Sequence, residues 1–245
     1  LPYNQDYLIS ELQKVNPNIG VLLVSGNAVS MPWISDVKAV LQTWYLGSEA
    51  GNAIADIISG DANPSGKLPF SFPVKLTDNS AHFFGELSYP GDGETQNYKE
   101  GILVGYRWHD TKNIKPLFSF GHGLSYSSFK ITDIKSDKKI YTANDSINIT
   151  YKLKNTGSKD GAEVVQVYIG ILKSKVLRAL KELKGFKKTY LGAGNQTSEI
   201  ITINVSDLSF YDESISNWNL EKGSYMIYVG NASDGVSEQI NIKVK

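Results

Sequence analysis

The sequence predicts a partial α/β sandwich, a parallel-type sheet with helices, followed by an all-β sandwich of the fibronectin-III or immunoglobulin type. Two short, continuous apolar runs, at 19–24 and 39–45, suit strands that are buried on both faces of a parallel sheet. After Phe129 the apolar runs instead alternate with polar residues, which is typical of antiparallel strands. We expect the α/β part to span residues 1–124 and the β part to span 125–245.

The α/β part is expected to begin with a helix over residues 6–15. Its apolar side chains fall on one helical face: Tyr7, Leu8, Leu12 and Val15. A second helix is expected to open at 47–49 and to run through Ile58, with Ser48 as N-cap and Gly60 as the stop. Two buried strands are too few to close a layered α/β domain, so we expect this part to be incomplete.

The segment 63–129 is rich in Gly, Pro and aromatic residues and is expected to be ordered but irregular, with one strand over 101–108. The β part follows without a flexible linker, so the two parts are expected to pack together. Its expected strands are 131–134, 146–155, 163–171, 180–190, 198–205, 223–229 and 239–244. Seven short strands over roughly 115 residues are typical of an immunoglobulin-like sandwich.

Composition narrows the function classes. The formal net charge is zero, which argues against nucleic acid or an anionic membrane as partner, and no apolar run is long enough to span a bilayer. The chain has no cysteine, which excludes disulfides and thiolate chemistry and favours a bacterial-type cytoplasmic protein slightly over a secreted one. The first residue is Leu1, so we expect a processed or cloned piece of a longer protein. Five sequons are interpreted as chance occurrences: Asn144, Asn148, Asn195, Asn204 and Asn231.

Several strings, in order along nearly the whole chain, resemble the C-terminal region of family 3 glycoside hydrolases of the β-glucosidase type. They are 27–33 (NAVSMPW), 44–56 (WYLGSEAGNAIAD), 60–69 (GDANPSGKLP), 100–108 (EGILVGYRW), 116–126 (PLFSFGHGLSY), 165–168 (VQVY) and 181–186 (KELKGF). The resemblance implies a retaining exo-glycosidase of the β-glucosidase or β-xylosidase type, which hydrolyses terminal β-linked sugars. It also implies a barrel, an α/β sandwich and a fibronectin-like domain, of which this chain holds only the later sandwich and the fibronectin-like part.

The resemblance also implies where the catalytic groups lie. Retaining glycosidases use two carboxyl groups about 5–5.5 Å apart. In the family, the nucleophile is an Asp on the barrel and the acid/base is a Glu on a sandwich loop, and neither motif occurs here. We therefore expect no catalytic residue, cofactor or metal in this chain, and no activity of the chain alone. The β-glucoside substrate would bind through the missing barrel, and sugar and linkage specificity would depend on it.

Local carboxylates offer a weaker alternative. Glu49 and Asp56 are seven residues apart on a helix, about 10 Å along its axis, which would suit an inverting pair. We favour a dipole-stabilising position for Glu49 and a solvated one for Asp56. A second set flanks a Gly/Pro-rich loop and is interpreted as solvated: Glu86, Asp92, Glu94 and Glu100.

Other reactive residue types lack the spacing that their chemistry needs. His82, His109 and His122 do not form a zinc motif and are interpreted as turn or interface residues. None of three candidate serines, Ser25, Ser65 and Ser125, lies in a nucleophile elbow. Residues 47–51 lack the pattern of a phosphate loop.

Aromatic residues leave a sugar-binding alternative open. Five could stack on sugar rings, but we favour core or interdomain packing for them: Trp33, Trp44, Tyr45, Tyr106 and Trp108. Arg107 is expected to pin the junction between the two parts.

A carbohydrate-binding module is the alternative function, and a purely structural fibronectin-like module is another. We expect no exposed aromatic stripe in the β part, because its aromatics fall mostly at core or turn positions: Tyr151, Tyr168, Phe186, Tyr190, Phe210, Tyr211, Trp218, Tyr225 and Tyr228.

An incomplete sheet also predicts a partner. A sheet that lacks strands has an open edge and an uncovered apolar face. We expect residues 1–122 to bind the N-terminal barrel and early sandwich segment, or to associate with a second copy through the open edge.

Overall fold

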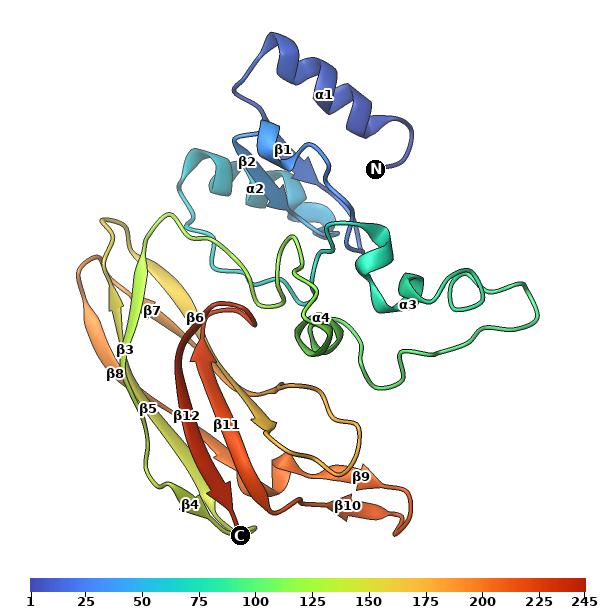
Figure 1. Ribbon diagram of the computed structural model, residues 1–245. Helices are drawn as coiled ribbons and strands as arrows, with labels where there is room; N and C mark the ends of the chain where they lie inside the picture. Colours follow the sequence, from blue (N-terminus) through green and yellow to red (C-terminus); the bar gives the residue numbers. More distant parts are fainter.

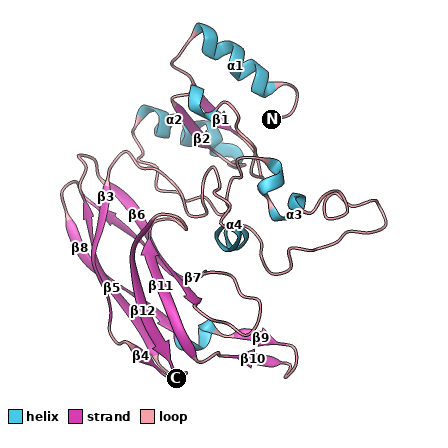
Figure 2. Ribbon diagram, viewed as in Figure 1, coloured by secondary structure: helices cyan, strands magenta, loops and turns pink.

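The computed structural model describes all 245 residues, and it places an α/β half above a β-sandwich half (Figures 1 and 2). The helices all lie in the α/β half, apart from short 3-10 turns: α1 (Gln5–Val15), α2 (Ala50–Ser59), α3 (Ser80–Phe83) and α4 (Tyr106–Lys112). The same half holds two strands, β1 (Gly20–Leu23) and β2 (Ala39–Gln42). None of the helices combines the length and apolar character that crossing a membrane would require.

Strands β1 and β2 pair in parallel, with Gly20 opposite Ala39, as the apolar runs predict. Both strands are shorter than expected, and the expectation that they are buried on both faces is wrong for this chain. Leu23 is buried, but Leu22 and Val24 are exposed, because no further strand or helix covers them. The sheet thus consists of one strand pair with two open edges.

Two local expectations in this half also fail. Residues 101–108 are not a strand: Gly101 and Gly105 have positive φ values of 58° and 57°, so the chain turns into α4 instead of extending. Helix α2 starts at Ala50 after a 3-10 turn over Gly47–Glu49, and Ser48 makes no capping hydrogen bond. Gly60 does end this helix in the left-handed conformation, with φ of 83°, as expected.

The β half consists of two packed sheets, of which one has the strand order β4-β12-β11-β6-β7 and the other β3-β5-β8. Their bounds are β3 (Phe129–Ser136), β4 (Ile140–Tyr141), β5 (Ser146–Asn155), β6 (Gly161–Ile171), β7 (Glu182–Leu191), β8 (Gln196–Asn204), β11 (Gly223–Gly230) and β12 (Val236–Val244). Side chains from both sheets form one core of 18 buried residues, which includes Ile149, Val167 and Ile227. This burial of two inner faces against each other is what stabilises the sandwich.

A short hairpin of β9 (Phe210–Asp212) and β10 (Asn217–Asn219) was not expected from the pattern. It exposes Tyr211 and Trp218, which are directly opposite each other across the two strands. On β7, Phe186 and Tyr190 are exposed as well. Four of the aromatic side chains that we expect mostly at core or turn positions are therefore exposed, whereas Tyr151, Tyr168 and Tyr225 are buried.

The two halves pack tightly, as the absence of a linker predicts. The Tyr106 ring on α4 meets the edge of Tyr168 on β6 across the junction, with centroids 5.7 Å apart, and it stacks on Phe120 of its own half with centroids 4.7 Å apart. The Tyr106 hydroxyl also accepts the backbone N–H of Leu183 at 2.8 Å. Arg107 faces Glu182 on β7 at 3.5 Å, so the expected junction role of this arginine is confirmed.

Candidate functional site

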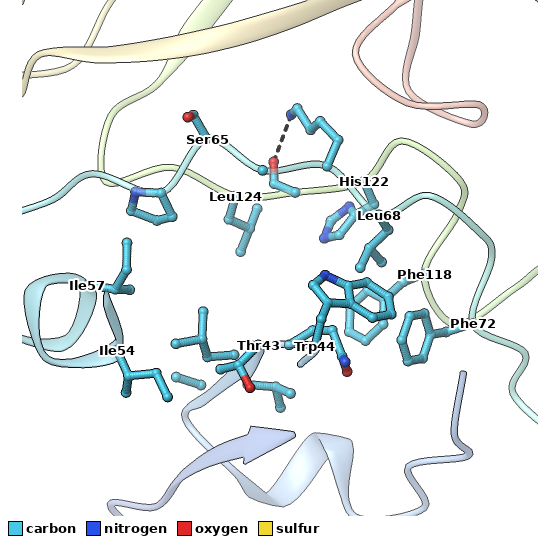
Figure 3. A pocket seen from close by; sticks show the side chains of 18 of the residues that line it. Thr43, Trp44, Ile54, Ile57, Ser65, Leu68, Phe72, Phe118, His122 and Leu124 are labelled. Atoms are coloured by element: carbon cyan, nitrogen blue, oxygen red, sulfur yellow. Dashed lines mark hydrogen bonds between the residues drawn. The ribbon is translucent and has the colours of Figure 1, made fainter. Parts of the chain in front are cut away.

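An apolar pocket of about 660 Å³ lies beside β2 in the α/β half (Figure 3). One wall is the segment 37–44, which contains β2, and another is the inner face of α2, with Ile54 and Ile57. The loops around Leu68 and Leu124 complete the lining. Trp44 is held there by an edge contact with Phe70, with centroids 5.2 Å apart.

The pocket runs along the free edge of β2. Successive side chains of a strand point to opposite faces, so a pocket over one face would be lined by every second residue. Here all eight residues from Val37 to Trp44 line it. Strand β2 pairs only with β1, so the backbone groups on this edge have no strand partner. The pocket therefore has the shape and the hydrogen-bonding groups to receive an extended segment.

The polar groups in this pocket are few. The Thr43 hydroxyl donates to the Leu23 carbonyl at 2.9 Å, and the Lys67 ammonium donates to the Gly123 carbonyl at 2.9 Å. The His122 ring stacks on Phe118, and burial lowers the pKa of His122 below its ordinary value. No Asp or Glu lines the pocket, so it offers apolar contact and not acid–base chemistry with two carboxyl groups.

The structure does not bring the candidate carboxylates together. Glu49 accepts a hydrogen bond from the Asn52 amide at 2.6 Å, and Asp56 is exposed on the same helix. In the loop, Asp92 accepts the backbone N–H of Thr95 and then that of Glu94, which holds its pKa below the ordinary value. Glu86 and Glu94 are exposed, as expected. The solvated interpretation is wrong for Glu100, which is buried with one carboxyl oxygen unpaired.

The histidines and serines hold local structure. His109 is buried, and its Nδ1 lies 3.0 Å from the Ile114 carbonyl; His82 meets the edge of Tyr89. No three His, Cys, Asp or Glu side chains lie close enough together to hold a metal ion. Ser25 donates to the backbone of Asn27, Ser125 donates to the side chain of Asn63, and Ser65 lines the pocket.

The candidate sugar-stacking aromatics are mostly packed. The Trp33 indole donates to Asp6 at 2.5 Å and the Trp108 indole donates to the Asp78 carbonyl at 3.1 Å, and both rings are buried. Trp44 lines the pocket and Tyr106 lies in the junction, as described above. Tyr45 alone is exposed to solvent. The packing interpretation is thus confirmed for four of these five residues.

The sequence did not signal the pocket itself. It forms because chain segments around Trp44, Leu68 and Leu124 meet in space, and each of them alone has an ordinary apolar pattern. The sequence pointed to this site only indirectly, because it contains just two predicted buried strands and so indicates a sheet edge without a neighbouring strand.

Comparison with known proteins agrees with this architecture. Residues 1–126 match the family described as "Glycosyl hydrolase family 3 C-terminal domain", and residues 163–233 match a "Fibronectin type III-like domain". This combination of an α/β unit and a fibronectin-like sandwich defines the class, the C-terminal units of glycoside hydrolases. The chain belongs to glycosyl hydrolase family 3, as the ordered strings indicated.

Several of the proteins that this chain resembles are longer than the chain itself. "Beta-glucosidase BoGH3A" from Bacteroides ovatus is 47% identical over 96% of the chain, and "Thermostable beta-glucosidase B" from Acetivibrio thermocellus is 43% identical over 100% of it. The crystal structure of DesR, a β-glucosidase from Streptomyces venezuelae in complex with D-glucose, superimposes with a TM-score of 0.92 at 38% identity and covers 100% of the chain. The chain spans 32% of the length of both curated relatives and 31% of the DesR chain.

Proposed function

We propose that this chain is the C-terminal, non-catalytic portion of a β-glucosidase-type exo-glycosidase. Its α/β half, residues 1–124, would be the later part of a sandwich domain, and residues 125–245 would be the fibronectin-like domain. The acid pair that cleaves the glycoside would lie in the rest of the protein. The three similar proteins named above are β-glucosidases, which supports this activity for the whole enzyme.

The observation that carries the proposal is the open edge of β2 with its apolar pocket. An extended segment from the remainder of the enzyme would pair with β2 and fill the space beneath α2, because strand addition satisfies backbone groups while apolar side chains fill the pocket. The exposed apolar face of α1 supports the same proposal, since Leu8, Leu12 and Val15 lie one turn apart and are uncovered here. Association with a second copy through this edge is the alternative.

The role of the chain would be to hold the walls of the active site. A displacement of about 1 Å in a catalytic group can lower the rate on the order of 100-fold, so a rigid support is a catalytic requirement. The tight junction between the two halves fits that role, because the edge contact between Tyr106 and Tyr168 and two buried ion pairs, Lys67–Glu163 and Lys181–Asp110, cross it. The sandwich would brace the α/β half from the side opposite α1 (Figure 1).

The test is complementation of activity. The remainder of the enzyme and this chain are expressed separately, mixed, and assayed for hydrolysis of a nitrophenyl β-glucoside. We expect neither part alone to turn over substrate and the mixture to do so. Ile54→Lys, which places a charge in the pocket, should abolish complementation, whereas Asn52→Lys, at an exposed position of the same helix, should not. Turnover by this chain alone that disappears on mutation of one of its own carboxylates would overturn the proposal.

A further inference from the structure

A second, polar groove lies at the crease between the two halves, where the C-terminal end of α2 meets β6 and β7. Its volume is about 1050 Å³, and only three of its 13 lining residues are hydrophobic. Ligand pockets in proteins usually have volumes of about 300–1,000 Å³, so the groove has room for several sugar rings. Its composition is opposite to that of the apolar pocket beside β2.

Two tyrosine rings line this groove, and both are anchored through their hydroxyl groups. The Tyr126 hydroxyl donates to the Ile57 carbonyl at 2.6 Å, and the Tyr190 hydroxyl donates to Asp160 at 3.3 Å. The rings remain accessible, since Tyr190 is 68% exposed and Tyr126 is 49% exposed. Phe186 is exposed on the same face of β7, four residues before Tyr190 and therefore about 13 Å along the strand. Fixed rings of this kind offer apolar faces beside polar groups.

The floor of the groove is preorganised by Asn63. Its side-chain amide donates to the Asp160 carbonyl at 2.7 Å, while its oxygen accepts from the Ser125 hydroxyl at 2.9 Å and from the Tyr126 backbone at 2.8 Å. Asp160 in turn accepts the backbone N–H of Ala193 at 2.8 Å. A ligand that binds here would meet groups already in place, which reduces the entropy lost on binding.

The charges in the groove indicate a neutral ligand. Two lysines, Lys159 and Lys188, and two aspartates, Asp61 and Asp160, line the groove, so its formal charges cancel. Neither lysine forms an ion pair in the structure, so their ammonium groups are free to donate hydrogen bonds. A nucleic acid or another polyanion would favour an excess of basic groups. A protein partner would favour an apolar anchor pocket, which this groove lacks.

We propose that this groove binds a short neutral oligosaccharide. The tyrosine rings would stack on the apolar faces of sugar rings, and the carboxylates, ammonium groups and Ser hydroxyls would exchange hydrogen bonds with sugar hydroxyls. The proposal does not depend on the hydrolytic role of the whole enzyme, because all of the groups belong to this chain.

The test is isothermal titration of the 245-residue chain with cellotetraose, xylotetraose and a sulfated tetrasaccharide. We expect the two neutral sugars to bind with millimolar or tighter Kd and the sulfated one to bind no better. Tyr190→Ala should weaken binding by about fivefold or more, and Tyr190→Phe should stay within about twofold, because the ring is what stacks. The matched control is Trp218→Ala, which removes an equally exposed ring, 68% accessible, on the β9–β10 hairpin.

A second variant keeps the result clear if Tyr190→Ala perturbs the fold. Asp61→Ala, on the opposite wall, should weaken binding by about threefold and leave the thermal unfolding midpoint unchanged, since the only side-chain partner of Asp61 is the exposed Ser59. The proposal is overturned if neither neutral sugar binds, if the sulfated sugar binds better, or if Trp218→Ala weakens binding as much as Tyr190→Ala. None of these measurements requires turnover, so they stand apart from the complementation assay.

Discussion

The Lys67–Glu163 ion pair joins the two halves at the scale of single residues. Its N–O distance is 2.6 Å, and the two side chains are only 13% and 8% exposed. Lys67 also donates to the Gly123 carbonyl, so it connects two segments of the α/β half to β6. Removing one member of such a buried pair leaves the other charge desolvated and unpaired.

We expect Lys67→Ala to lower the free energy of unfolding by about 3–5 kcal/mol. The control is Lys152→Ala, because the Lys152–Asp133 pair is similarly short at 2.7 Å but its side chains are 45% and 55% exposed. That change should cost about 0.5 kcal/mol or less. Urea unfolding followed by circular dichroism measures both, and equal losses would show that burial of the junction pair has no energetic role.

Acid should destabilise the start of the sandwich through Asp145. The Lys138 ammonium, and after it the N–H and hydroxyl of Thr142, hold the pKa of Asp145 at about 2, below its ordinary value of 3.8. A depressed folded-state pKa contributes stability above the unfolded value, and this contribution is lost as pH falls through the folded value. Between pH 4 and 2, Asp145→Asn should therefore lose less stability than the unaltered chain. Urea midpoints at pH 7, 4 and 2.5 test this, and parallel pH profiles would contradict it.

At the scale of elements, the alternating pattern of β8 separates a core face from a solvent face. Ile201 is 5% exposed and belongs to the sandwich core, whereas its neighbour Ile200 is 47% exposed. Ile201→Ala should cost about 2–5 kcal/mol, because it removes buried methyl groups and leaves a cavity. Ile200→Ala should cost less than about 1 kcal/mol. Chemical denaturation distinguishes them, and similar costs would mean that β8 does not keep its register in solution.

The same elements show what local sequence can predict. Strands β5 and β8 followed from alternation, and α1 followed from helical spacing, because one period dominates each segment. The strand predicted over residues 101–108 is wrong because two glycines there adopt positive φ, which the apolar composition does not reveal. The β9–β10 hairpin is not predicted because strands of three residues are too short to show a period.

The sequence predicts the candidate sites only in part. The sequence indicated that Arg107 would lie at the junction and that the sheet was incomplete. The apolar pocket and the polar groove both depend on segments far apart in the chain, such as Asn63 and Asp160, which are 97 residues apart. Periodicity and short motifs carry no information about such contacts, so only the folded structure reveals them.

For the whole molecule, the uncovered face of α1 should govern association of the isolated chain. Leu8, Leu12 and Val15 are exposed together on this helix. We expect the chain to self-associate with rising concentration, and we expect Leu12→Lys to shift it toward monomer without lowering its melting temperature, since no residue of α1 is buried. Sedimentation velocity measures the fractions of monomer and of associated chain for the unaltered protein and for the variant. A stable monomer at all concentrations would show that this face does not require a cover.

The loop between α3 and α4 projects away from the body, while the segments on either side of it are bound to each other (Figure 1). Before the loop, Leu68 and Phe72 exchange backbone hydrogen bonds of 2.8 Å with His122, Gly121, Phe118 and Leu117, which follow it. A protease that nicks the exposed chain near Gly93 would therefore release nothing under native conditions. The two pieces should co-elute in gel filtration and separate only in detergent, so the molecule should tolerate a backbone break there and accept new chain ends or an inserted tag.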